Sequence, residues 1–150
     1  MNLSLIDAFV RRHPLVGLDS MVFIYHAMGP PRYGDASARV LEILKRAPGS
    51  GCTSTVSLAE VMVHPLRIGS APLVARYRLL LRDNQLVALL PITPRVAEQA
   101  AGLRAYHGLR LADALQLAAV TLAGATGFIT NDASFRRVAV PEVLLLSDVV

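Results

Sequence analysis

The sequence is poor in two residue types, and each shortage narrows the class of protein. It contains a single cysteine, Cys52, which cannot form an internal disulfide or a cysteine-rich zinc site. We therefore expect a reducing compartment, the cytoplasm. It also contains a single lysine, Lys45, so the formal net charge of +4 is carried by arginine. Arginine binds phosphate and carboxylate groups through paired hydrogen bonds, and this basic balance (pI about 9.8) is compatible with a phosphate-bearing partner.

Long apolar runs are also missing. No stretch reaches the ~18 consecutive apolar residues of a membrane span, and the longest candidate, residues 117–129, is interrupted by threonine and glycine. The first residues lack the charged-then-apolar order of a signal peptide. Yet 53% of the residues are hydrophobic. We attribute the surplus to buried helix faces and a protein–protein interface, and we expect a homodimer, a partner chain or both.

The 150 residues suffice for one domain with a substantial core, so we predict a single domain over residues 1–150. Apolar runs of strand length lie at residues 15–18, 52–56, 86–90, 127–130 and 143–146. Segments with helical periodicity lie between them, at residues 20–28, 36–47, 57–64, 71–82, 94–107 and 111–123. This alternation predicts an α/β fold: a parallel sheet of four to five strands with helices on both faces.

Three local details of these helices are specific enough to test. Residues 1–14 form a lead-in that we predict to be a short amphipathic helix, with Leu5, Ile6 and Phe9 facing inward. Pro65 is expected to end the helix that starts at Ser57. The helix over residues 111–123 is expected to bury one face, made of Leu111, Leu115, Ala118, Ala119 and Leu122.

Four acidic residues sit at or near predicted helix starts, and each has an ordinary local explanation. Asp19 could cap the helix that follows it. Glu60 completes an S-x-x-E capping box with Ser57. Asp113 lies in a first helical turn, where the helix dipole favours an anion, and Asp132 could be a turn residue.

Taken together, the four acids favour a metal site. At least three of them closely follow a predicted strand, and in a right-handed parallel sheet those points lie on one edge, where open α/β folds bind ligands. Gathered carboxylates raise one another's pKa by repulsion, and a divalent cation removes that cost. Oxygen ligands without a companion histidine or cysteine cluster suit Mg²⁺ or Mn²⁺ better than zinc. Asp19 and Asp113 are our first choices as ligands, Asp132 is next, and Glu60 is last because the capping box competes for it.

Four segments, LDSMVFIYH, SLAEVMVHPLR, LADALQLAAV and FITNDASF, resemble the signature blocks of the PIN-domain nucleases, especially the VapC-type toxins of toxin–antitoxin modules. The resemblance covers residues 18–135 and implies a PIN-like three-layer α/β/α sandwich. By position, Asp19, Glu60, Asp113 and Asp132 match the family's acidic cluster, and Ser20 and Thr130 match polar positions that support it. The sequence departs from the family in its lead-in, residues 1–14, since the first acid usually lies within a few residues of the start.

The resemblance implies a metal-dependent endoribonuclease that is silenced by a cognate antitoxin and forms a homodimer. Phosphodiester hydrolysis needs an activated water and a stabilised leaving oxygen, which Mg²⁺ or Mn²⁺ held by carboxylates can supply. Single-stranded or loop RNA is the expected substrate, because a splayed backbone can reach a recessed site. Arginines at the rim would offset repulsion between acids and phosphates, and we select Arg32, Arg110 and Arg136.

Two other functions compete with this one. A non-catalytic PIN-like module would bind RNA or protein without cutting, although the retention of all four acids argues against it. A phospho-acceptor signalling domain also gathers carboxylates around Mg²⁺, but it needs a lysine near the end of the last strand, and Lys45 comes far too early. His26 and His64 lie in apolar helical surroundings, and we interpret them as packing or edge residues instead of general bases.

Overall fold

The computed structural model describes residues 1–83 and 85–150. Its strands are β1 (Val16–Leu18), β2 (Gly51–Ser54), β3 (Ala88–Leu90), β4 (Gly127–Thr130) and β5 (Glu142–Leu145). Its α-helices are α1 (Leu3–Arg12), α2 (Ser20–Met28), α3 (Pro31–Arg46), α4 (Thr55–Arg67), α5 (Ala71–Arg78), α6 (Pro94–His107) and α7 (Leu111–Leu122). Three shorter helical segments complete it: the π-helical η1 (Leu79–Asp83) and the 3₁₀ helices η2 (Ala133–Arg137) and η3 (Leu146–Asp148).

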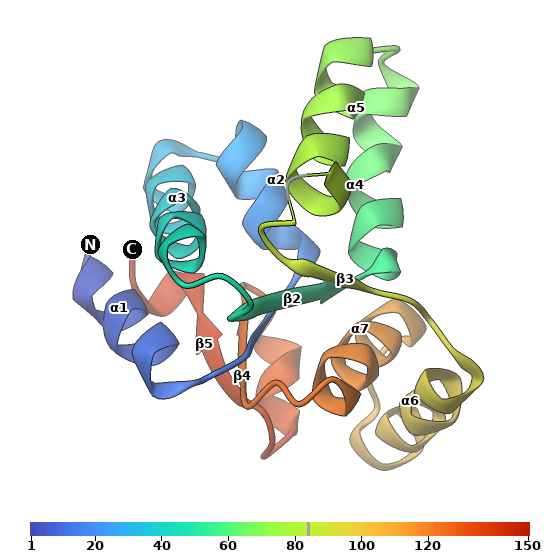
Figure 1. Ribbon diagram of the computed structural model, residues 1–150. Coiled ribbons are helices and arrows are strands. Elements are labelled where there is room, and N and C mark those ends of the chain that lie inside the picture. Colours follow the sequence, from blue (N-terminus) through green and yellow to red (C-terminus); the bar gives the residue numbers. More distant parts are fainter. Residues whose placement is uncertain (84) are drawn as a thin grey trace.

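The five strands form one parallel sheet in the order β3-β2-β1-β4-β5. Helices cover both of its faces, as predicted: α1, α2 and α3 pack on one side, and α6 and α7 on the other (Figure 1). Each face has its own apolar core. Phe23 and Ile129 belong to the core under α1–α3, whereas Leu117 and Phe128 belong to the core under α7.

Helix α7 lies very close to the centre of the sheet. A Cβ atom added at Gly17 of β1 would lie 2.9 Å from Cβ of Val120. Small residues of α7, Ala114 and Ala118, are completely buried at this interface. Leu111, which we expected on the buried face, is instead 55% exposed, because the helix turns Ala114 and Leu117 toward the sheet. The close contact holds α7 directly against β1.

Helix α4 differs from the prediction at both ends. It begins at Thr55 with Ser54 as its N-cap, two residues earlier than expected, and it runs through Pro65 to Arg67. Pro65 is buried and lies in the last turn, where a missing N–H costs the helix only one hydrogen bond near its end. With α5, helix α4 forms a pair that projects from one end of the sheet (Figure 1).

Helix α3 also starts earlier than predicted, at Pro31 instead of residue 36. Proline is tolerated in a first turn because its missing N–H has no partner there in any helix, so the Gly29-Pro30-Pro31 segment acts as a start signal. The helix predicted over residues 71–82 is interrupted: α5 ends at Arg78 and continues as the π-helical η1.

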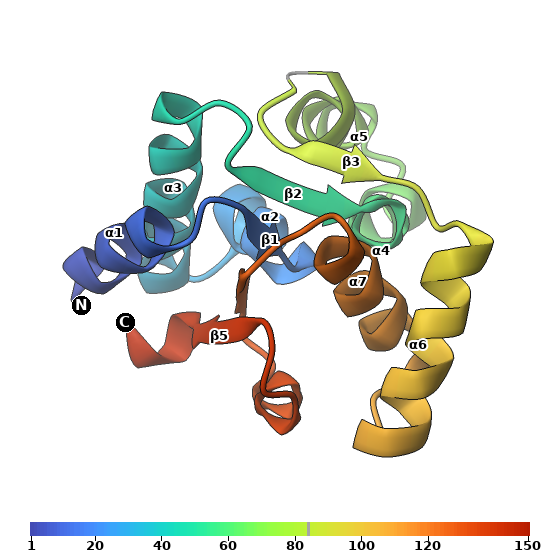
Figure 2. The same ribbon diagram turned by 60° about the horizontal axis from the view of Figure 1, so that its bottom comes forward.

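The lead-in forms α1, as predicted, and it lies against α3 near both chain ends (Figure 2). Ile6, Phe9 and Val10 are its buried residues. Leu5 is 43% exposed, so the prediction that it faces inward was wrong. At the end of the lead-in, the imidazole of His13 lies 2.9 Å from Thr126 Oγ1 and 2.9 Å from Glu142 Oε2, at the amino ends of β4 and β5. No helix in the described part of the chain has both the length and the hydropathy needed to cross a membrane.

Candidate active site

The four acids of the predicted site come from four different elements near the carboxyl edge of the sheet. Asp19 directly follows β1 and caps α2, and Asp132 follows β4 and caps η2. Asp113 lies in the first turn of α7, and Glu60 lies in α4, the helix that follows β2. Negative charge on Glu60 and on Asp113 acts on the carboxyl group of Asp19. Asp19, Glu60 and Asp113 are therefore close enough for their charges to interact.

Asp19 is the most constrained of the four. Its main-chain N–H donates to the carbonyl of Ile129 (3.0 Å), which joins it to β4. Its side chain is 7% exposed and accepts hydrogen bonds from Thr130 Oγ1 (2.6 Å) and from the main-chain N–H of Ser20 (2.8 Å). Ser20 and Thr130 thus support Asp19 as the prediction required.

Burial raises the pKa of the Asp19 carboxyl to about 6. The hydrogen bonds from Thr130 and Ser20 lower the pKa, while the neighbouring charges of Glu60 and Asp113 raise it further. The ionised form of the Asp19 carboxyl therefore destabilises the folded protein, and a cation beside it would offset that cost.

A buried glutamine that was not among the predicted site residues supports this edge of the sheet. Gln116, one turn after Asp113 on α7, is 2% exposed and donates from Nε2 to the carbonyl of Leu18 (2.6 Å) and to Thr53 Oγ1 (3.0 Å). Its Oε1 accepts a hydrogen bond from Ser54 Oγ. The amide therefore ties α7 to the carboxyl ends of β1 and β2, next to Asp19. A polar residue within an apolar helical face was the available signal.

Asp113 and Asp132 are joined by Arg110, which immediately precedes α7. Its Nε donates to Asp113 Oδ2 (3.1 Å), and its Nη2 donates to Asp132 Oδ2 (3.4 Å). Asp132 is also fixed from its other side, because its Oδ1 accepts from the N–H of Ser134 (2.8 Å) and its own N–H donates to Thr130 Oγ1 (3.0 Å). Thr130 consequently links Asp19 to Asp132.

Glu60 is exposed in the middle of α4 and forms no capping box. The helix starts at Thr55, so Glu60 is too far along it to reach the cap, and Ser57 Oγ lies instead 2.9 Å from Thr53 Oγ1. The competing explanation for Glu60 was therefore wrong, and its carboxylate is free for another role.

The other two predicted arginines do not join the acidic cluster. Arg136 of η2 pairs with Asp148, and Arg32 is exposed in the first turn of α3. His64 is exposed on α4, and burial lowers the pKa of the half-buried His26. The buried thiol of Cys52 has its pKa raised to about 12 by desolvation, which suits a packing role.

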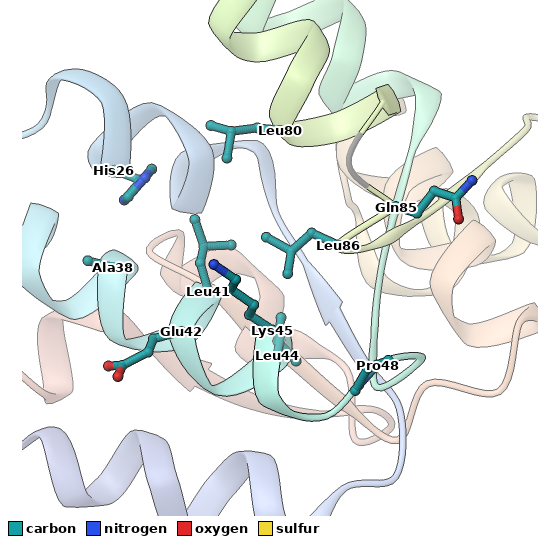
Figure 3. A pocket seen from close by; sticks show the side chains of 10 residues that line it. All are labelled: His26, Ala38, Leu41, Glu42, Leu44, Lys45, Pro48, Leu80, Gln85 and Leu86. Atoms are coloured by element: carbon teal, nitrogen blue, oxygen red, sulfur yellow. The ribbon is translucent and has the colours of Figure 1, made fainter.

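One pocket is separate from the acidic edge. A pocket of about 830 Å³ is formed by residues of α2, α3, η1 and the segment before β3. Figure 3 shows Leu41, Leu80 and Leu86 directed into it, with His26, Glu42 and Lys45 around them. Lys45 thus lies away from Asp19, which removes the residue that a phospho-acceptor site would need.

The donor chemistry of the cluster fits a hard divalent cation, although the side chains do not enclose one. Within the described residues, no three acidic, histidine or cysteine side chains close into a coordination shell. Arg110 supplies positive charge between two of the acids instead. The set is all carboxylate, and the ionised form of Asp19 is disfavoured first by burial and then by its negative neighbours. Carboxylate oxygens are ligands that suit Mg²⁺ or Mn²⁺.

The fold is similar to chains of several solved structures. One is a toxin–antitoxin complex from Klebsiella pneumoniae, with 23% identity, a TM-score of 0.65, and coverage of 87% of this chain and 97% of that chain. Another is FitAcB from Neisseria gonorrhoeae, with 22% identity, a TM-score of 0.65, and coverage of 89% and 99%. A third is VapBC2 from Rickettsia felis bound to a promoter DNA fragment, with 14% identity, a TM-score of 0.67, and coverage of 87% and 98%.

At these identities the likeness concerns the fold, and no curated protein matches the sequence. The family model of the PIN domain matches residues 16–141, from the start of β1 to the residue before β5. Because this match covers most of the sequence, the chain belongs to the PIN-domain family.

Proposed function

We propose that this protein is a metal-dependent endoribonuclease and the toxin component of a toxin–antitoxin module. The observation that carries the proposal is the acidic cluster at the carboxyl edge of a PIN-family sheet. Its centre is a buried Asp19 under the influence of Glu60 and Asp113, with Asp132 linked to Asp113 through Arg110. PIN domains are generally nucleases, and the four acids are the residues that such chemistry needs.

In this proposal each acid has a role that follows from its surroundings. Asp19 and Asp113 would bind the cation directly, and Asp132 would be the next ligand. Glu60 is the exposed member, so it binds through water or orients the attacking water. A bound Mg²⁺ or Mn²⁺ would polarise the phosphate, activate the water and stabilise the leaving oxygen. Thr130 and Ser20 hold the Asp19 carboxylate in one orientation for that purpose.

RNA and protein partners are part of the same proposal. Single-stranded or loop RNA is the substrate, since its backbone can be splayed to reach the recessed Asp19. An antitoxin is proposed because similar folds occur in toxin–antitoxin complexes. Four exposed apolar side chains lie on α4, on η1 and between these two elements: Val63, Leu66, Ile68 and Leu79. They form a surface that an antitoxin or a second copy of this chain would cover in the cytoplasm.

The test is cleavage of a mixed RNA pool by antitoxin-free protein in Mg²⁺, Mn²⁺ or EDTA, with an Asp113→Asn variant beside the wild type. We expect metal-dependent cutting that is lost in EDTA and reduced by about 100-fold or more in the variant, because a charged group at the reacting phosphate is removed. Asp83→Asn is the matched control, since Asp83 pairs with Arg82 on η1.

Cutting that persists in EDTA and in Asp113→Asn would refute the assignment and indicate a contaminating nuclease. Wild-type protein that binds RNA but leaves it intact in both metals would favour the alternative, a non-catalytic PIN-like binding module. An equal loss of RNA cleavage in Asp83→Asn would show that removal of any acid harms the protein. That outcome would also count against the proposed site.

A further inference from the structure

Arg110 occupies an unusual position for a surface arginine. Its guanidinium spans two acids from different elements, Asp113 of α7 and Asp132 at the start of η2, at 3.1 and 3.4 Å. Both are proposed metal ligands. The side chain of Arg110 is nevertheless 79% exposed, so little packing holds it in place. It is therefore a cation that contacts the cluster and is free to move.

Neighbouring arginines are committed elsewhere. Arg137 donates from Nη1 to the carbonyl of Gly108 (3.2 Å), which holds it against the turn between α6 and α7. Arg136 pairs with Asp148. Of these three arginines, Arg110 is the one whose side chain contacts Asp113 and Asp132.

The energies of these contacts favour exchange with a divalent ion. Exposed ion pairs contribute about 0.2–1 kcal/mol each, because water and salt screen them. A divalent cation carries twice the charge and bonds directly to oxygen, so it competes well for the same carboxylates. A guanidinium and a metal ion close to the same two oxygens also repel each other. Arg110 must leave at least one of its acids when the ion binds.

We propose that Arg110 is the internal counterion of the acidic cluster. Arg110 binds Asp113 and Asp132 in the metal-free protein, and the divalent cation displaces it. The inference rests on the proposed function, because it takes these acids as metal ligands. Displacement releases a guanidinium at the rim of the site. There it can bind a phosphate of the RNA, so that metal loading and substrate binding are coupled through one side chain.

The test measures the affinities for Mn²⁺ and for RNA, which should change in opposite directions when Arg110 is replaced. Mn²⁺ binding, measured by calorimetry without RNA, should become about 3- to 10-fold tighter in Arg110→Ala, because a competing cation is gone. Binding of a 2′-O-methyl single-stranded RNA at saturating Mn²⁺ should become about 3- to 10-fold weaker, because a phosphate contact is gone. Arg110→Gln, which keeps most of the side chain's length without its charge, should behave in the same way.

Arg82→Ala is the matched control, since Arg82 is also an exposed arginine paired with an aspartate, Asp83. It should leave both affinities unchanged. If wild-type protein binds Mn²⁺ and the Arg110 variants bind it no more tightly, the counterion role is refuted while the nuclease proposal stands. If wild type and all variants bind no Mn²⁺, both the proposed function and this inference fail.

Discussion

The ionised carboxylate of Asp19 destabilises the folded protein. Its carboxyl pKa is raised from 3.8 to about 6, mainly because the group is buried. Between these two pH values the folded state binds more protons than the unfolded chain, so the free energy of unfolding falls as pH rises from about 4 to 6. Above pH 6 the penalty is constant and amounts to about 3 kcal/mol, as an upper bound. The fold retains this cost where a cation can relieve it.

Asp19→Asn should therefore separate stability from metal binding. In EDTA at pH 7.5 the variant should be more stable than wild type by up to about 3 kcal/mol, and the difference should shrink toward zero near pH 4. Addition of Mn²⁺ should stabilise wild type and leave the variant unchanged. Denaturant unfolding at the two pH values, with and without metal, measures all three effects. A variant that is less stable than wild type at pH 7.5 in EDTA would contradict the assigned cost of the buried charge.

At the scale of elements, α7 carries both a site residue and its support. Asp113 and Gln116 are three residues apart and so lie on the same side of this helix. Asp113 contacts Arg110 at the acidic edge, and Gln116, one turn further on, is buried against β1 and β2. Helix α1 has a different task. It packs on α3, and its following residue His13 contacts the amino ends of β4 and β5, the opposite edge from Asp19. We infer that α1 stabilises the fold and takes no part in catalysis.

Adjacent residues of α1 test this role. Ile6→Ala should lower the free energy of unfolding by about 2–5 kcal/mol, because Ile6 is completely buried and its removal leaves a cavity. Leu5→Ala should cost less than about 1 kcal/mol, since Leu5 is 43% exposed. RNA cleavage per folded molecule should be unchanged in both variants. Equal destabilisation by the two changes would mean that α1 is rotated from the orientation described.

For the whole molecule, the charge distribution predicts how RNA binding responds to salt. The chain carries a net charge of +4 although its candidate site is acidic, so the RNA affinity that we propose would come from its arginines. With two to four phosphates contacted, raising KCl from about 50 to 200 mM should weaken binding of single-stranded RNA by about 7- to 50-fold. Fluorescence anisotropy with cleavage-deficient Asp113→Asn protein measures this response. An affinity that is independent of salt would exclude phosphate contacts as the main source of binding.

Much of the fold follows from local signals in the sequence. The limits of β4 and α6 were predicted to the residue, because glycine, proline and a capping threonine mark them. The positions of Asp19 and Asp132 near one edge could also be predicted, since both follow parallel strands, whereas Asp113 follows α6 and its position depends on how α7 packs on the sheet. The metal they are expected to bind remains a prediction.

Tertiary packing decided the rest. Periodicity could not tell Leu5 from Ile6 as the inward residue, because that depends on how α1 rotates against α3. Pro65 within α4 also depends on context, since its burial offsets a lost hydrogen bond. The contacts of Gln116 with Leu18 and of Arg110 with Asp132 join residues that are distant in sequence, which no local pattern encodes. The sequence alone predicted that four acids would lie near one edge of the sheet. Only the folded chain determined their burial, their hydrogen bonds and the position of Arg110 between two of them.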